Sequence, residues 1–132
     1  MKLDPDYLKK ILLAFEESPT PTTDIEFLKS LGLDFNDDPF VFHMGILADL
    51  RLIERDDGDR GYGLFRSADG QAFWSVLPLR MTARGYEFLE DIRDPEIWRI
   101  TKERAKGVGQ ASLEFLWEIA KVEVKSKLGL GP

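Results

Sequence analysis

A chain of 132 residues with 43% hydrophobic and 32% charged residues has the composition of one soluble globular domain rather than a disordered protein. It contains no cysteine, which excludes a disulfide framework, a thiolate nucleophile and a cysteine zinc site. No hydrophobic run approaches the roughly 20 residues that a membrane span needs. We therefore expect a cytoplasmic protein with no membrane association.

The formal net charge of −6 disfavours unaided attraction to a phosphate backbone, and the charge is unevenly distributed. Residues 1–61 carry 7 Lys and Arg against 14 Asp and Glu, whereas residues 62–132 carry 11 against 10. The first half of the chain is therefore the acidic half.

Two helices are predicted before residue 33. Asp4 and Pro5 are typical of the start of a helix, and the prolines at 19 and 21 end it. Its buried stripe is Leu8, Ile11, Leu12 and Phe15. The pattern Thr23-x-x-Glu26 is a capping box for a short second helix, which runs through Ile25, Leu28 and Leu31 and ends at Gly32.

A third helix is predicted from Asp38 as the cap and Pro39 as the first helical residue, followed by a strand at 52–55. Its inward face is Phe40, Met44, Leu47 and Leu50.

The outward face of this third helix carries Phe42, Ile46 and Asp49, and no Lys or Arg occurs between Lys29 and Arg51. A DNA-reading helix would place basic or amide side chains there to meet base edges. Two interpretations stay open. Either later helices of the chain cover Phe42 and Ile46, or these residues form a surface for protein binding or self-association.

A β-ribbon is predicted after the third helix. Strands at 64–66 and 72–77 flank the turn formers Asp69 and Gly70, and the second strand continues past Pro78 into residues 79–82. This pattern predicts an antiparallel wing of two or three strands, with Pro78 at an edge or bulge. The basic residues that could contact phosphate lie in or beside this wing: Arg55, Arg60, Arg66, Arg80 and Arg84.

Three more helices are predicted in the second half. Thr82 caps a helix over 83–92, Pro95 starts a helix that ends in Lys106-Gly107-Val108-Gly109, and Ser112 caps a helix that runs to about Leu128. The last helix is hydrophobic on more than one side, so it either crosses the core or pairs with its copy. We favour a homodimer, formed through Phe115, Trp117, Ile119 and Val122.

The pattern Leu79-x-Met-Thr-x-x-Gly-x-x-Phe-Leu-x-x-Ile-Arg-Asp, followed by Trp98 and by Lys102-x-x-x-Lys106-Gly-x-Gly, resembles domain-of-unknown-function family 2513. The resemblance covers nearly the whole chain. It implies a winged-helix fold and a bacterial or prophage origin, and it supplies no catalytic residues. The sequence departs from the family at Leu50-Arg51-Leu52-Ile53, where the family tends to have Ala-Gly-Leu-Ile.

We expect no cofactor or metal. His43 is the only histidine and is interpreted as structural, and the loop 56–59 lacks the spacing of a calcium site.

The predicted fold class is α+β, mainly α. It is a winged helix-turn-helix over residues 1–94 with a helical extension over 95–132, which packs on the domain or mediates dimerisation. The predicted function is non-enzymatic DNA binding and transcription regulation. The alternative is a winged-helix-shaped protein-interaction module with a phage or host partner.

Overall fold

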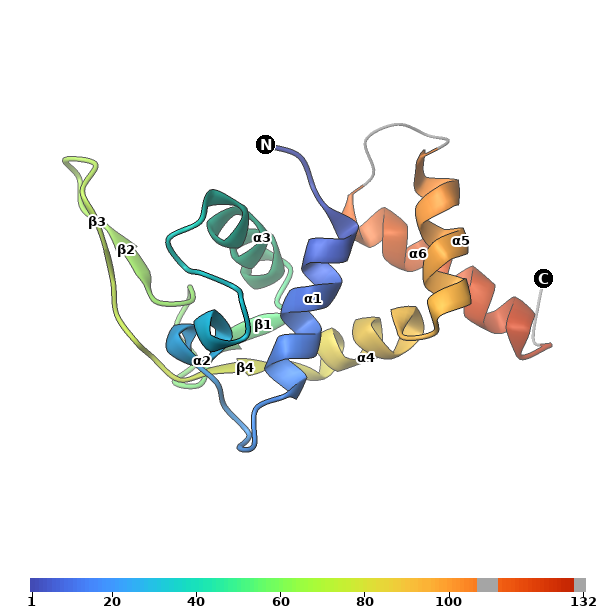
Figure 1. The fold of residues 1–132 in the computed structure, drawn as a ribbon, viewed down its shortest axis with the longest axis horizontal. Helices are drawn as coiled ribbons and strands as arrows, with labels where there is room; N and C mark the ends of the chain where they lie inside the picture. The colour runs from blue at the N-terminus through green and yellow to red at the C-terminus, as the bar shows by residue number, and fades with distance from the viewer. Residues whose placement is uncertain (107–111, 130–132) are drawn as a thin grey trace.

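The computed structural model describes residues 1–106 and 112–129 and is α+β and mainly helical, which confirms the predicted class at that level (Figure 1). The elements follow in the order α1 (Pro5–Glu16), α2 (Ile25–Ser30), α3 (Asp38–Asp49), β1 (Ile53–Arg55), β2 (Leu64–Arg66), β3 (Ala72–Trp74), β4 (Leu79–Met81), α4 (Ala83–Ile92), α5 (Pro95–Lys106) and α6 (Leu113–Lys127). The Gly107-x-Gly109 end predicted for the fifth helix lies outside the described residues.

Three of the predicted helix caps are confirmed. The Asp4 carboxylate accepts from the N–H groups of Asp6 and Tyr7 at the start of α1. Thr82 and Ser112 accept hydrogen bonds from the third residue of α4 and α6, respectively. Each of these side chains satisfies N–H groups that have no partner inside the helix, which is why the starts could be read locally.

Two predicted caps are wrong by one residue. Asp24, not Thr23, caps α2, with its carboxylate 2.9 Å from the N–H of Phe27. Thr23 instead exchanges backbone hydrogen bonds of 2.7 and 2.8 Å with Leu79, so its extended backbone is part of a β-bridge. Helix α3 begins at Asp38 and its N-cap is Asp37, so Pro39 is the second helical residue rather than the first. Both positions suit proline, because the N–H groups of the first turn have no partner inside the helix.

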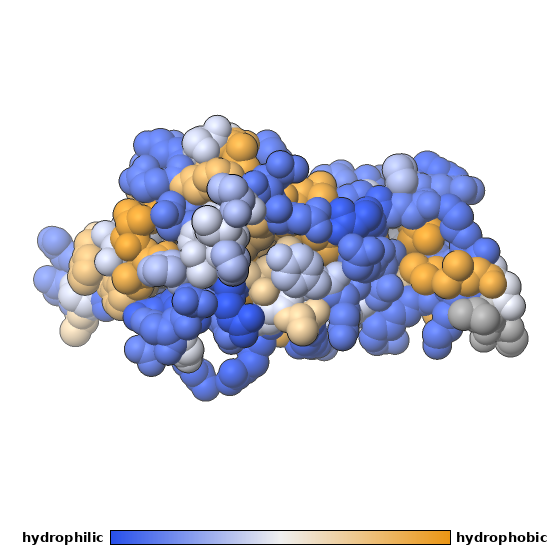
Figure 2. Space-filling view, turned by 90° about the horizontal axis from the view of Figure 1, so that it is seen from below, coloured by the Kyte–Doolittle hydropathy of each residue, from blue (hydrophilic) through white to orange (hydrophobic). Residues whose placement is uncertain are grey.

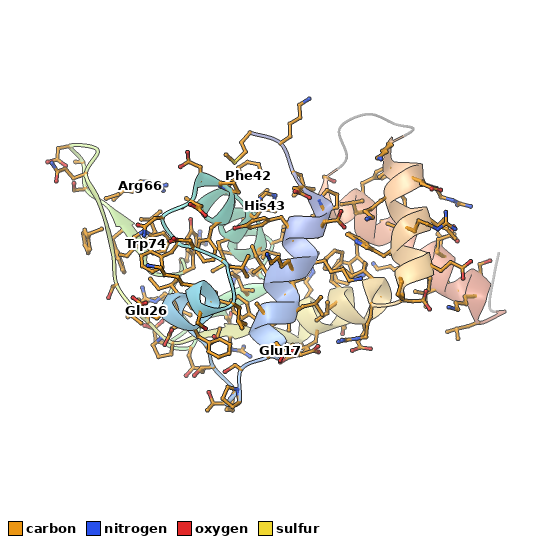
Figure 3. All side chains as sticks on the ribbon, in the orientation of Figure 1. Glu17, Glu26, Phe42, His43, Arg66 and Trp74 are labelled. Atoms are coloured by element: carbon orange, nitrogen blue, oxygen red, sulfur yellow. The ribbon has the colours of Figure 1, made fainter. Side chains whose placement is uncertain are left out.

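The strands form two separate antiparallel ribbons rather than one continuous wing. Strand β1 pairs with β4, and β2 pairs with β3 around the predicted turn at Asp69-Gly70. The predicted strand 72–77 stops at Trp74, whose ring leaves the ribbon to pack beside Phe35 and Phe40 (Figure 3). Pro78 lies between β3 and β4, and its carbonyl oxygen accepts a hydrogen bond from the N–H of Asp56. Its missing N–H does not interrupt either ribbon, because Pro78 belongs to neither strand.

One hydrophobic core connects the helices. The predicted stripe of α1 is fully buried, and it packs against α2, α4 and β4. Helix α6 packs on α4 and α5, and its residues Leu113, Trp117 and Ala120 belong to the same core as α1 (Figure 1). Leu50, which is predicted on the inward face of the third helix, is only half-buried after the last turn of α3, and Leu31 is 40% exposed after the end of α2.

Candidate functional site

Helix α3 is flanked on both sides along its outer surface. Its inward face is in the core, where Phe40, Met44 and Leu47 have no exposed surface. On one flank, the hydroxyl of Tyr62 donates to the carbonyl of Val41 at 3.2 Å, so the loop between β1 and β2 lies against the helix. The other flank borders a groove. Other parts of the chain therefore border the outer surface of α3 on both flanks.

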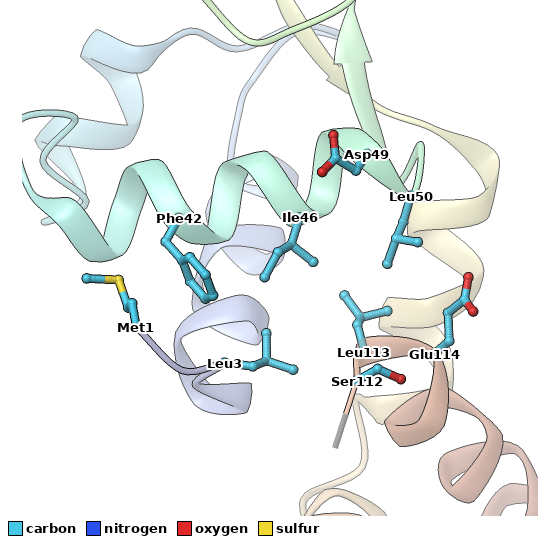
Figure 4. A pocket seen from close by; sticks show the side chains of 9 residues that line it. All are labelled: Met1, Leu3, Phe42, Ile46, Asp49, Leu50, Ser112, Leu113 and Glu114. Atoms are coloured by element: carbon cyan, nitrogen blue, oxygen red, sulfur yellow. The ribbon is translucent and has the colours of Figure 1, made fainter. Parts of the chain in front are cut away.

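The groove lies between α3, the N-terminal segment and the first turn of α6, and its volume is about 530 Å³ (Figure 4). Two of the three residues predicted as an interaction face, Phe42 and Ile46, are half-buried and form its floor, and Asp49 stands at one end. The remaining hydrophobic lining comes from Met1, Leu3, Leu50 and Leu113. The structure thus brings together hydrophobic side chains from three distant parts of the chain.

His43 fixes the N-terminal wall of this groove. Its Nε2 atom accepts a hydrogen bond of 2.9 Å from the N–H of Asp4, and its Nδ1 atom lies 2.6 Å from the Pro39 carbonyl oxygen (Figure 3). This arrangement requires a neutral ring with the proton on Nδ1. The side chain is 2% exposed and its ring lies 4.8 Å from that of Tyr7. A buried ring with a partner at each nitrogen is what the predicted structural role of His43 requires.

One end of the groove is acidic. Glu114, on the first turn of α6, lies at this end, 3.7 Å from the guanidinium of Arg84. The exposed side chain of Asp49 makes no hydrogen bond or ion pair within residues 1–106 and 112–129, and its carboxylate points away from Phe42 and Ile46 (Figure 4). The same Arg84 donates to the carbonyl of Leu50 at 2.6 Å, which joins the α6 wall to the end of α3. No basic side chain lines the groove in the described part of the chain.

Three of the five arginines proposed for phosphate contact are bound to acidic residues of the same chain. Arg55 lies 2.5 Å from Asp57, a contact that lowers the pKa of that carboxyl, and Arg80 lies 2.5 Å from Glu54. Arg84 is the third. Of these five arginines, only Arg60 and Arg66 are exposed without an acidic partner among the residues that the structure describes.

The family model described as "Hypothetical protein (DUF2513)" matches residues 2–111. The chain belongs to domain-of-unknown-function family 2513. No curated protein and no solved structure matches it. Within the described residues of this family 2513 protein, no helix is both long and hydrophobic enough to cross a membrane, and no three metal-ligating side chains gather at one point.

The four residues proposed for dimerisation do not share one face in this family 2513 protein. Trp117 is only 6% exposed, and its Nε1–H donates to Asp91 at 2.8 Å, so it is a core residue and not a dimer contact. It lies on the inward side of α6 with Leu113 and Ala120. Phe115, Ile119 and Val122 are on the opposite side and reach solvent.

Two features of the site escaped the sequence reasoning. Leu3 and Leu113 line the groove, although each reads only as a residue at the start of a predicted helix. Arg51 has a φ of 58°, a left-handed backbone conformation that non-glycine residues rarely adopt. The departure from the family's Gly at this position was the available signal for it.

Proposed function

We propose that this family 2513 protein is a non-enzymatic winged-helix protein that uses the flank of its third helix to bind another protein. The order of three helices followed by a ribbon supports the winged-helix assignment. The bridge between Thr23 and Leu79 adds a third extended segment to the β1–β4 pair. On this assignment, α3 takes the place of the reading helix and the β2–β3 ribbon is an elongated wing.

The proposed protein binding rests on the groove beside α3. Its floor is hydrophobic and partly open, with Phe42 and Ile46 only half-buried. Hydrophobic grooves bordered by a helix commonly receive an amphipathic helix from a partner. The stretch from Phe42 to Asp49 covers eight residues, or about 10 Å of helix. A partner helix of about two turns, with hydrophobic residues at positions i, i+4 and i+7, matches that length.

The charges at the groove define the polar part of the partner. Glu114 lies at one end, opposite the end formed by Met1 and Phe42, and Asp49 is at the same end with its carboxylate pointing to the other side of α3 (Figure 4). A partner with Lys or Arg following its hydrophobic residues would place a positive charge near Glu114. Such complementarity mainly contributes specificity and a faster association rate.

Duplex reading by α3 is less well supported. The outward face carries Phe42, Ile46 and Asp49 instead of donors for base edges. Tyr62 lies against one flank of the helix and the N-terminal segment borders the groove on the other. Acidic residues outnumber basic ones two to one in residues 1–61, so the phosphate backbone would be repelled.

A peptide-display selection tests the proposed function. A library of helical peptides of about 14 residues is selected on the immobilised protein, with counter-selection on Ile46→Asp, which puts a charge on the groove floor. Val76→Asp is the matched control, because Val76 is 50% exposed and lies between the ribbons rather than in the groove. We expect enriched peptides that bind the wild type and Val76→Asp but lose at least tenfold in affinity for Ile46→Asp. If no enriched peptide distinguishes these proteins, the groove is not a protein-binding site.

A second candidate function is DNA binding through the wing. Arg60 and Arg66 are the observation in its favour, because neither is paired with an acid in the part of the chain described. Phe65 and Phe73 stack at 5.4 Å on the ribbon beside Arg66. Anisotropy titration with a labelled duplex at about 50 mM salt, where phosphate contacts are strong, tests it. We expect Arg60→Gln with Arg66→Gln to reduce the affinity at least tenfold. Absence of binding by the wild type removes this candidate.

A further inference from the structure

A second hollow, the α5 pocket, lies between α5 and the N-terminal end of the chain (Figure 1). Its volume is about 600 Å³, and the nonpolar part of its lining consists of Leu3, Pro5, Ala105 and Leu116. Ala105 and Leu116 are buried, so they form its floor. Leu3 also lines the groove beside α3, so the N-terminal segment lies between the two hollows. Figure 2 shows that the surface at the α5–α6 end is mostly hydrophilic apart from one hydrophobic patch.

The charged part of the lining is mainly basic. Four basic and two acidic side chains line the pocket: Lys2, Arg99, Lys102, Lys106, Asp6 and Glu103. The four that belong to α5 occupy positions i, i+3, i+4 and i+7, so they share one face of that helix. The lining therefore carries a formal charge of +2, from four positive and two negative groups, in a chain whose net charge is −6.

Most of the basic side chains have N–H groups free for a ligand. Lys2 and Lys106 are exposed and form no ion pair within residues 1–106 and 112–129. Arg99 binds Glu103 at 3.2 Å, an exposed pair along one helix that contributes little and can exchange for another anion. Lys102 donates to Asp6 at 2.9 Å, and the two other N–H groups of its ammonium have no acceptor among the described residues.

One wall of the pocket is fixed by Trp98. The same oxygen of Asp6 accepts from the Nε1–H of Trp98 at 2.9 Å and from Lys102. The amines of Lys9 and Lys102 each lie 5.6 Å from the centre of the Trp98 ring, which is 5% exposed. Burial and then the charge of Lys102 lower the pKa of Lys9. Positive charges are therefore crowded on this side of α5, and a bound anion reduces their mutual repulsion.

A phosphate monoester on a nonpolar body matches this lining. At pH 7 such a group carries a charge of about −1.5 to −2 and three acceptor oxygens, whereas a carboxylate carries one charge. Pockets for small molecules typically have volumes of about 300–1,000 Å³ and combine a hydrophobic lining with a few polar groups. We infer that the α5 pocket binds a phosphate monoester, with Lys2, Arg99 and Lys106 around the phosphate and the nonpolar body against Leu3 and Pro5. Binding here does not depend on the groove beside α3.

Calorimetric titration with 1-naphthyl phosphate tests this assignment. At low salt we expect a Kd below about 1 mM for the wild type. Inorganic phosphate lacks the nonpolar body and 1-naphthol lacks the charge, so each should bind at least about tenfold more weakly. Lys2→Glu with Lys106→Glu should also reduce the affinity for 1-naphthyl phosphate at least about tenfold.

Lys125→Glu is the matched control for this double variant. Lys125 is exposed, forms no ion pair in the described part of the chain and does not line the pocket, so its affinity should stay within about threefold of the wild type. Lys2 and Lys106 likewise have no ion pair to lose within the described residues, so the fold should tolerate both changes. Retention of binding by the double variant, or equal affinity for inorganic phosphate, would overturn the inference.

Methyl signals in NMR spectra locate the ligand. Those of Ala105 and Leu116 should shift when 1-naphthyl phosphate is added, whereas those of Ile46, in the groove beside α3, should not. Shifts at Ile46 in place of Ala105 and Leu116 would overturn the inference and leave the proposed peptide binding at the groove to its own test.

The phosphate monoester can belong to a soluble metabolite or to a lipid, and two further titrations separate these sources. Adenosine monophosphate presents the group in solution. Phosphatidylcholine vesicles that contain phosphatidic acid present it at a membrane surface, with pure phosphatidylcholine vesicles as the control. Binding of either one that the double variant loses supports the inference and identifies the source. If the wild type binds neither of these nor 1-naphthyl phosphate, the α5 pocket is not a phosphate site.

Discussion

Replacing Arg51 by glycine is expected to give a more stable protein than replacing it by alanine. Arg51 follows the end of α3, and its N–H donates to the carbonyl of Ala48 at 3.0 Å. The next N–H, of Leu52, donates to Leu47 at 2.9 Å, which completes a Schellman motif. This motif needs a left-handed residue after the helix, and Arg51 provides it with a φ of 58°.

The magnitude follows from two opposing terms. A side chain with a Cβ atom costs roughly 1–2 kcal/mol in the left-handed region. Glycine lowers that cost but gives the unfolded chain more freedom, which removes about 0.5–1 kcal/mol of the gain. The net stabilisation relative to alanine is therefore about 0.5–1 kcal/mol. Alanine is the proper reference, because Arg51→Ala also removes the favourable charge at the helix C-terminus, worth about 0.3–1 kcal/mol.

Urea unfolding of wild type, Arg51→Gly and Arg51→Ala measures the effect. Arg51→Gly should have the higher midpoint of the two variants at an unchanged dependence on urea, and a melting temperature about 2–5 °C above that of Arg51→Ala. If Arg51→Gly is no more stable than Arg51→Ala, the left-handed conformation is not the source of strain at this position and the reasoning is refuted.

Three further predictions concern stability and the groove wall. Gly85→Ala should destabilise the protein by about 2–3 kcal/mol in urea unfolding, because the added Cβ would lie only 2.2 Å from the backbone carbonyl oxygen of Leu52. Arg93 binds Glu16 at 2.7 Å and lowers the pKa of that carboxyl below its ordinary 4.5. The stabilisation is therefore present above about pH 4.5 and lost as the pH falls further. At pH 7 the free energy of unfolding of the wild type should exceed that of Glu16→Gln by about 0.5 kcal/mol after solvent screening, and this difference should vanish in acid. His43→Phe should expose the N–H of Asp4 to hydrogen exchange, whereas His43→Gln, which keeps an acceptor, should retain part of its protection.

Local signals made the helices predictable. Asp4, Thr82 and Ser112 each act on N–H groups two or three residues away, so their effect is present in the sequence itself. The stripe of α1 has a helical period and is buried as that period indicates. Thr23 shows the limit of such reasoning, because its pairing with Leu79, 56 residues later, outweighs a local capping pattern.

The site was only partly predictable for the same reason. The outward face of α3 with Phe42 and Ile46 could be found from periodicity, but the residues that form the sides of the groove could not. Its walls come from Leu3 and Leu113, which no local pattern relates to residue 46. The arginines show the converse problem. Arg80 is an available phosphate ligand in the sequence, and only the pairing of β1 with β4 places Glu54 beside it.

The groove is built as a preformed site, because polar contacts connect its three walls. The N-terminal wall is attached to α3 through the hydrogen bond from Asp4 to His43, and His43 is itself fixed by Pro39. The α6 wall is attached to the end of α3 through Arg84, which binds both Leu50 and Glu114. A rigid groove loses little conformational entropy when a helix enters, so more of the hydrophobic contact contributes to affinity. A change at His43 should therefore weaken binding of groove-selected peptides without altering any side chain on the groove floor.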